Sequence, residues 1–339
     1  MTSIEIKKFS PKSDQYCWTF GGVDPVLRLE PHSILHTWTE DAFSGKITSD
    51  KDLPSKVLEP YSTNPQTGPF YVEGAEPGDT LAIHFISIRP SRNWAVSTTI
   101  PLFGSLSTTK YTPLLHDTLP EKVWMYKVNE EKNSVTFQAS DSNFQTDIPM
   151  HPFHGTVGVA PAGSEVRSSL VPEAFGGNMD SPEVCEGSTL FLGVNVKGAL
   201  FSLGDGHYVQ GQGEVCGVAV EGAMETEIGI ELIKNRYVEW PVIENDDYIM
   251  TVGSYRPLED AFRIAQTQMI KCLASNYGLS IMDAYQLVSQ VNETPIANVV
   301  DPNYTVVTKV HKKFLPRGHN FMGGAHNNLR KISNDYQNG

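Results

Sequence analysis

The chain has 339 residues, of which 40% are hydrophobic and 19% charged, a composition ordinary for a soluble globular protein. Its 26 Lys and Arg against 39 Asp and Glu give a formal net charge of −13, and its densest basic run is only residues 311–313. We therefore expect no nucleic-acid partner. No stretch approaches the roughly 20 apolar residues of a membrane helix, and residues 1–10 lack the apolar core of a secretory signal, so we expect a cytoplasmic protein with no membrane partner.

The four cysteines are scattered along the chain without a CxxC pair, at Cys17, Cys185, Cys216 and Cys272. This spacing favours reduced thiols over a disulfide framework. It also excludes a cysteine-rich zinc site.

The region from residue 25 to about 234 repeats short β-branched and aromatic runs bounded by Gly, Pro, Asn and Asp. Residues 80–88, 134–137 and 215–220 are examples. The pattern predicts a mainly β protein with a β-sandwich or barrel core, not an alternation of strands and helices. We expect a β-sandwich domain over residues 1–150 and a second β-rich domain over residues 151–238.

The pattern changes after Trp240, where residues 257–274 place their apolar side chains close to one helical face. A second helix is predicted over residues 280–289, with Ser280 and Asp283 in capping-box positions. Strands near residues 297–300 and 305–310 complete a smaller α+β unit over residues 239–318. We expect residues 319–339 to form an extended tail.

In the segment from Leu203 to Cys216, acidic, imidazole and amide side chains alternate with four glycines. Asp205, His207 and Glu214 are residue types that ligate divalent metals, and a site with three protein ligands and an open position can lower the pKa of bound water to about 7. The alternative is an ordinary hairpin loop with a surface histidine. Gln210 lies between these residues and is a candidate substrate-binding group.

Strand parity bears on which acids can reach one site. If residues 214–221 form one uninterrupted strand, Glu214 and Glu221 face opposite sides of it. Glu221 is in step with Glu225 and Glu227, a pattern typical of a solvated face. We therefore favour Glu214 for the site.

Two further loops carry candidate polar groups. In residues 175–181 a Gly pair precedes Asn178 and Asp180, which can bind a substrate or support an ion; an Asx turn is the alternative. In residues 39–45 Asp41 can reach a site, unless this is a solvated loop. His154 and His84 are more simply interpreted as hydrogen-bonded structural residues.

Taken together, these segments resemble the acetamidase/formamidase family over residues 25–310. The resemblance lies in residues 40–45, 67–80, 158–161, 176–180, 204–207, 210–217 and 299–302. It implies a β-rich soluble amidohydrolase that acts on small amides, and a bound divalent metal, zinc in the first place and calcium as the alternative. It also implies a homodimer.

Carried over by position, the resemblance implies one site with metal ligands Asp205, His207 and Glu214. Its catalytic groups would be Glu214 as general base, Asn178 as donor to the developing oxyanion, and Asp41. Asp180 and Gln210 would bind substrate. The chain departs from the family pattern at Phe175 and Asn64, where members often have His, and at Gln212, where they have Asp.

The leading hypothesis is hydrolysis of a small aliphatic amide, of the formamide or acetamide type, by water that a metal activates. One alternative is hydrolysis of a cyclic or larger amide at the same site. The other is a β-sandwich binding module whose site is degenerate.

Overall fold

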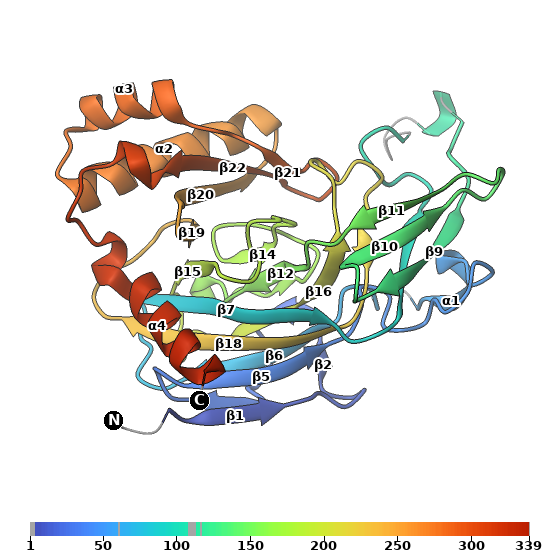
Figure 1. Cartoon of the computed structure of the whole chain (residues 1–339), viewed down its shortest axis with the longest axis horizontal. Helices are drawn as coiled ribbons and strands as arrows, with labels where there is room; N and C mark the ends of the chain where they lie inside the picture. Colours follow the sequence, from blue (N-terminus) through green and yellow to red (C-terminus); the bar gives the residue numbers. More distant parts are fainter. Residues whose placement is uncertain (1–3, 60–61, 108–112, 116, 339) are drawn as a thin grey trace.

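The computed structural model describes residues 4–59, 62–107, 113–115 and 117–338. Among these residues, nine strands form one sheet, in which β1 and β5 are parallel and the other neighbours antiparallel (Figure 1). In spatial order they are β1 (Ile6–Phe9), β5 (Ile34–Thr39), β18 (Met224–Ile233), β7 (Thr80–Pro90), β15 (Thr189–Gly193), β19 (Val242–Glu244), β20 (Tyr248–Tyr255), β22 (Tyr304–His311) and β21 (Ile296–Asn298).

A second sheet holds eleven strands of the described residues, and β16 pairs within it with β12, β17 and β6. Its main path is β11 (Gln145–Pro149), β10 (Ser134–Gln138), β9 (Lys122–Asn129), β8 (Trp94–Thr99), β17 (Val220–Glu221), β16 (Phe201–Val209), β12 (Phe153–Gly158) and β14 (Gly176–Asn178). β6 (Gln66–Val72) joins β16 to β2 (Tyr16–Cys17) and β4 (Leu27–Leu29), and β3 (Thr19–Phe20) pairs with β13 (Arg167–Ser168). The predicted mainly β class is confirmed.

Both sheets take strands from either side of residue 150. In the first sheet β18 lies between β5 and β7, and in the second β17 joins β8 to β16. The expected boundary at residue 150 is therefore not a boundary between sheets.

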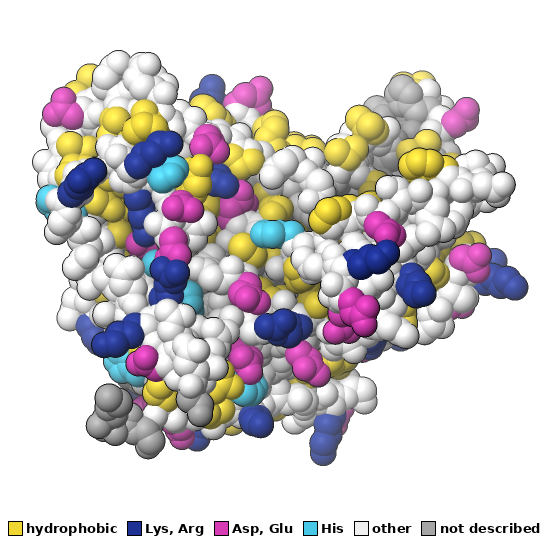
Figure 2. All heavy atoms as spheres, in the orientation of Figure 1, with side chains coloured by type: hydrophobic (Ala, Val, Ile, Leu, Met, Phe, Trp, Pro, Cys, Tyr) yellow, Lys and Arg dark blue, Asp and Glu magenta, His cyan; other side chains and the backbone are white. Residues whose placement is uncertain are grey.

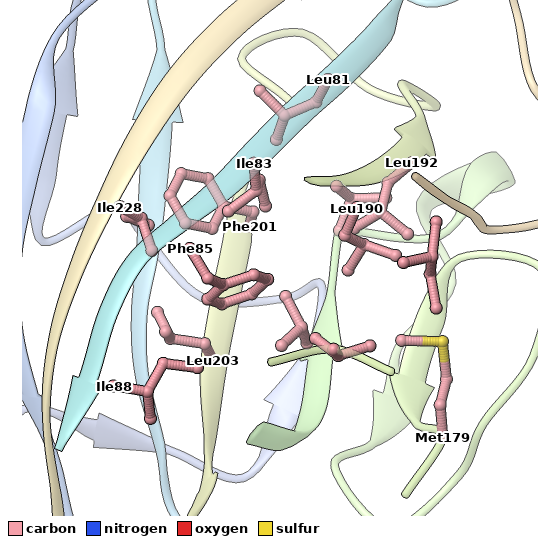
Figure 3. Packing of buried hydrophobic residues seen from close by; sticks show 14 of the residues in the cluster. Leu81, Ile83, Phe85, Ile88, Met179, Leu190, Leu192, Phe201, Leu203 and Ile228 are labelled. Atoms are coloured by element: carbon pink, nitrogen blue, oxygen red, sulfur yellow. The ribbon is translucent and has the colours of Figure 1, made fainter. Parts of the chain in front are cut away.

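The main core lies between the two sheets. Apolar side chains of β7 point toward those of β16, and Figure 3 shows Ile83 and Phe85 meeting Phe201 and Leu203. All four side chains are fully buried. β7 is buried along nearly its whole length because its opposite face is covered as well. Such burial on both faces explains its near-continuous apolar sequence.

The helices follow the expected pattern in the C-terminal unit. α2 (Leu258–Tyr277) lies over β20 and β22, and α3 (Ile281–Val291) packs mainly on α2 (Figure 1). The predicted cap is present, since the Ser280 hydroxyl accepts a hydrogen bond from the Asp283 N–H at 3.0 Å. The short elements are α1 (Pro54–Val57), η1 (Pro113–Leu115), η2 (Ala162–Ser164), η3 (Lys312–Phe314) and η4 (Phe321–Gly324). No helix in the described part of the chain is long and apolar enough to cross a membrane.

The expectation of an extended tail over residues 319–339 is wrong. After η4 the chain forms a helix, α4 (Ala325–Gln337), which packs across β7 and β18 (Figure 1). Ala325, Leu329 and Ser333 are buried at intervals of four, so one face of the helix covers the sheet. The opposite face exposes Arg330, Lys331 and Asp335. Charges of both signs are scattered over this side of the molecule (Figure 2).

Two buried histidines lie where α4 meets the sheet, one on each side of the contact. His84 of β7 contacts the Thr189 hydroxyl through Nδ1 at 2.9 Å, and His326 of α4 contacts the same hydroxyl at 2.8 Å. The other ring nitrogen of His326 lies 3.4 Å from Asp246. The structural role predicted for His84 is confirmed.

Candidate active site

Two of the predicted metal ligands lie on β16. Asp205 and His207 are buried and two residues apart, and Oδ1 of Asp205 is 3.4 Å from Nε2 of His207. The neighbouring Gly206 is required by close packing, because a Cβ there would lie 2.4 Å from the carbonyl oxygen of Gly222. Gly155 on β12 is likewise required by close packing, in this case against the site residues. A Cβ on Gly155 would lie 2.6 to 2.7 Å from Asp205, His207 and Asp180.

Both Glu214 and Glu221 reach His207, so the expectation that Glu221 belongs to a solvated face is wrong. Residues 214–221 do not form one strand: Glu214 lies in a turn with φ +47°, and Glu221 lies in β17 opposite His207. Strand parity therefore does not apply between them. Glu221 is only 2% exposed, and its Oε2 lies 3.3 Å from Nε2 of His207.

A second pair of acids comes from distant parts of the sequence. Asp180 follows β14, and Asp301 lies in the loop between β21 and β22. Both are buried, and the charge of Asp301 helps to raise the pKa of Asp180. Asn178 lies between them and donates to Asp301 at 2.8 Å and to Asp180 at 3.3 Å. Sequence reasoning missed Asp301, although it lies in the 299–302 segment that carries the family resemblance.

The side-chain oxygen of Asn178 also has hydrogen-bond partners. It accepts hydrogen bonds from the Asn64 amide at 2.8 Å and from the Thr156 hydroxyl. The Thr156 hydroxyl also lies 3.0 Å from Oδ2 of Asp205, and its single proton is directed to one of these two acceptors at a time. Asn178 therefore acts in this structure as a bridge that holds the acids in place.

The side chain of Gln210 contacts His207 and does not line the pocket. Its Oε1 lies 2.9 Å from Nδ1 of His207, while its amide nitrogen donates to the backbone oxygens of Asp180 and Ala297 at 2.8 and 3.0 Å. These two bonds direct Oε1 toward the imidazole. Nδ1 consequently carries the proton, and Nε2 faces the acids.

Asp41 is not brought to these acids. Its carboxylate accepts hydrogen bonds from the N–H groups of Phe43 and Gly45 and pairs with Arg92 at 2.7 Å. Its neighbours Ala42 and Phe43 line the site instead. The structure places Asp41 as the residue that shapes this loop.

The acids line a pocket of about 190 Å³. Its polar lining consists of Thr63, Asn64, Asn178, Asp180, Asp205, His207, Glu214, Glu221 and Asp301. Its apolar lining consists of Ala42, Phe43, Ile100, Phe103, Leu170 and Val218, with Gly217 between. Among the described residues that line the pocket there is no Lys or Arg.

Crowded buried acids perturb one another's titration. Burial raises the pKa of Glu214 well above its ordinary value, and it raises the pKa of Glu221 and that of Asp301 to about 7 each. Burial alone lowers the pKa of His207, but Glu221 and Asp205 outweigh this and hold it well above its ordinary value. The site therefore needs protons or a cation to balance its negative charge.

The donor set fits a divalent cation. Asp180, Asp205 and His207 offer ligand atoms within 4.8 Å of one another, and so do His207, Glu214 and Glu221. Oδ1 of Asp180 and Oε2 of Glu221 are buried without a hydrogen-bond donor in the described structure. Oxygen and imidazole ligands of this kind suit several divalent ions.

The three departures from the family pattern lie in different surroundings. Phe175 is buried and packs on Phe20 with ring centroids 5.3 Å apart, while Gln212 is exposed and lines no part of the pocket. Asn64 alone lines the pocket. His154, predicted to be structural, is buried and hydrogen-bonded through both ring nitrogens.

Comparison with known proteins agrees with this architecture. The profile of the Acetamidase/Formamidase family matches residues 15–170 and 163–314. A crystal structure of an acetamidase from Yersinia enterocolitica is 39% identical and superposes with a TM-score of 0.87 over 93% of this chain and 94% of that one. An acetamidase structure from Bacillus halodurans gives 26% identity and a TM-score of 0.81 over 91% and 98%. The chain belongs to the acetamidase/formamidase family.

Curated relatives match over shorter stretches. An acetamidase of Mycolicibacterium smegmatis is 27% identical over 271 residues, 65% of each chain. A formamidase of Methylophilus methylotrophus is 26% identical over 210 residues, 50% of this chain and 51% of that one. The matched stretch thus covers just under two thirds of the first relative and about half of the second.

Proposed function

We propose that this protein hydrolyses small aliphatic amides to the carboxylate and ammonia. The observation that carries the proposal is the buried cluster of His207 with five acids that lines a small pocket, in a chain of this family. Hydrolysis of an amide needs a nucleophilic water, polarisation of the carbonyl group and a proton for the leaving nitrogen. The cluster offers groups for each of these tasks.

The proposed metal ligands are Asp205 and His207, joined by Glu221 or Glu214 on one side and Asp180 on the other. A divalent ion bound there, zinc in the first place, would lower the pKa of a water and polarise the amide carbonyl. Gln210 supports this role because it fixes the tautomer of His207 that leaves Nε2 free.

Glu214 is the proposed proton carrier. It lies at the start of the turn formed by residues 214–217, and burial next to Asp301 raises its pKa, which makes it a stronger base than an exposed carboxylate. In the reaction it would accept a proton from water and deliver it to the departing nitrogen. Asn178 and Asn64 would keep the acids fixed rather than contact the substrate.

Product analysis with formamide and acetamide tests the proposal. We expect equal amounts of ammonia and carboxylate, and a loss of at least 100-fold in kcat/KM in His207→Ala. His319→Ala, at an exposed histidine outside the pocket, is the control. Undiminished turnover in His207→Ala would refute the assigned site, and absence of ammonia from every amide tried would refute the reaction.

A further inference from the structure

Part of the pocket lining is apolar, and this apolar wall has no part in the proposed chemistry. It is formed by three segments that are distant in the sequence: residues 42–43, residues 100–103 and Val218, with Leu170 at the edge. Phe43 and Val218 belong to a hydrophobic cluster that Ile100 and Phe103 join. The wall is therefore continuous with a packed core and does not depend on isolated surface side chains.

The wall is held in a fixed position relative to Glu214. The Ser105 N–H and hydroxyl both donate to the Val215 carbonyl oxygen at 2.9 Å. Phe103 rests directly on Gly217, where a Cβ would lie 2.5 Å from its ring. The loop that carries the wall and the turn that carries Glu214 thus form one packed unit.

The Phe43 side of the wall is fixed in the same way. The Asp41 carboxylate holds the Phe43 N–H at 2.9 Å, and Arg92 holds that carboxylate in turn. Phe43 is only 3% exposed. Asp41, predicted from the sequence as a catalytic residue, is on this geometry a positioning residue for the wall.

The pocket is larger than formamide or acetamide requires. Its volume is about 190 Å³, whereas a dry cavity of about 150 Å³ accommodates benzene. A formyl or acetyl group bound at the acids fills only part of this volume and cannot cover the whole apolar lining. Water would then cover apolar surface that a longer acyl group could cover instead.

We propose that the wall is an acyl-binding subsite, and that the preferred substrates are amides of short apolar acids with roughly three to five carbons in the acyl group. This inference rests on the proposed function, because it assumes that the amide group lies against the acids. Phe43, Ile100, Phe103, Leu170 and Val218 are then the specificity-determining residues. Each added methylene that reaches the wall raises kcat/KM roughly fourfold.

The experiment is a chain-length series of formamide, acetamide, propionamide, butyramide and isobutyramide with the full-length protein. We expect kcat/KM for butyramide to exceed that for acetamide about tenfold or more. In Ile100→Ala and Leu170→Ala the ratio of butyramide to acetamide should fall threefold to tenfold. Leu106→Ala, at an 82% exposed leucine of the same loop, should leave the ratio unchanged.

A binding measurement separates the two ways in which the series can fail. Thermal stabilisation by butyrate and by acetate at equal concentration reports on the wall without turnover. If no amide is hydrolysed, the proposed function fails, and stronger stabilisation by butyrate still supports the subsite. If amides are hydrolysed but kcat/KM falls steadily beyond acetamide, or if acetate stabilises the protein as well as butyrate, the subsite is refuted.

Discussion

Oε1 of Gln210 lies 2.9 Å from Nδ1 of His207, and this contact sets the orientation of the imidazole at the centre of the acid cluster. Gln210 cannot easily turn, because its amide nitrogen is bound to the backbone oxygens of Asp180 and Ala297. A residue expected from the sequence to bind substrate is thus a support for the proposed metal ligand.

Replacement of Gln210 should weaken metal binding before it affects the fold. In Gln210→Leu the Nδ1–H of His207 loses its acceptor, and we expect the dissociation constant for Zn²⁺ to rise about 10-fold to 100-fold. Titration of metal-free protein with Zn²⁺ measures this. Gln212→Leu, at an exposed position, should have no effect. Equal affinity in Gln210→Leu and the unaltered protein would contradict the assignment.

The two glycines Gly155 and Gly211 should respond differently to a single methyl group. In Gly155→Ala the added Cβ would collide with Asp180, Asp205 and His207 at 2.6 to 2.7 Å, so the cluster must spread. We expect a loss of at least 100-fold in kcat/KM. Gly211→Ala meets nothing within 4 Å and has no positive φ, so it should behave as the unaltered protein. Equal activity of the two variants would show that the floor of the site is not where we place it.

Glu221 and Glu225 provide a test of the corrected strand geometry. Glu221 is buried against His207, whereas Glu225 is exposed on β18. We expect Glu221→Gln to reduce kcat/KM by a factor of 100 or more and to lower the metal content of the purified protein. Glu225→Gln should change neither. Similar small effects of both substitutions would contradict the position of Glu221 beside His207 and would favour the solvated face that strand parity predicts.

The difference between sequence and structure at Glu221 has a physical reason. Alternation along a strand predicts faces only while the strand continues, and the turn at residues 214–217 reverses the chain between Glu214 and Glu221. The position of Asp301 near Asp180 could not be predicted from local patterns either, because it depends on how the C-terminal unit packs against the rest of the protein. Asp205 and His207 could be predicted because their glycine-rich surroundings are local.

The fold shows the same division. The runs at residues 80–88 and 134–137 are strands, and α2 and α3 are helices, as local periodicity and capping predict. The run at residues 215–220 was also expected to be a strand, but it is a turn that leads into the short β17. The order of strands in the sheets depends on long-range pairing, such as that of β18 between β5 and β7. The helix α4 was missed because its polar composition hides the four-residue spacing of Ala325, Leu329 and Ser333.

Acid should destabilise the protein by protonating His84 of β7 and His326 of α4. Burial lowers the pKa of His84 to about 3 and that of His326 to about 4. Both are neutral when folded, whereas in the unfolded chain they take up protons below about pH 6.5. Their contribution to stability is therefore complete above pH 6.5 and is lost as the pH falls toward 4, by about 1.4 kcal/mol per histidine and pH unit.

Thermal unfolding at pH 7, 6 and 5 measures this dependence. In His326→Gln the decrease in Tm between pH 7 and pH 5 should be smaller than in the unaltered protein, whatever the Tm at pH 7. His319→Gln, at an exposed histidine, is the matched control and should retain the full decrease. A decrease that is the same in all three proteins would show that His326 does not titrate as described.

The central claim, that His207 and the surrounding acids hold a divalent ion needed for amide hydrolysis, is tested most directly by ammonia release as a function of bound metal. The full-length protein is stripped with a chelator, and ammonia from acetamide and butyramide is measured while Zn²⁺ is added back and bound metal is counted. We predict negligible release from the stripped protein and recovery in proportion to bound metal. Full activity in protein shown to contain no metal would contradict the account.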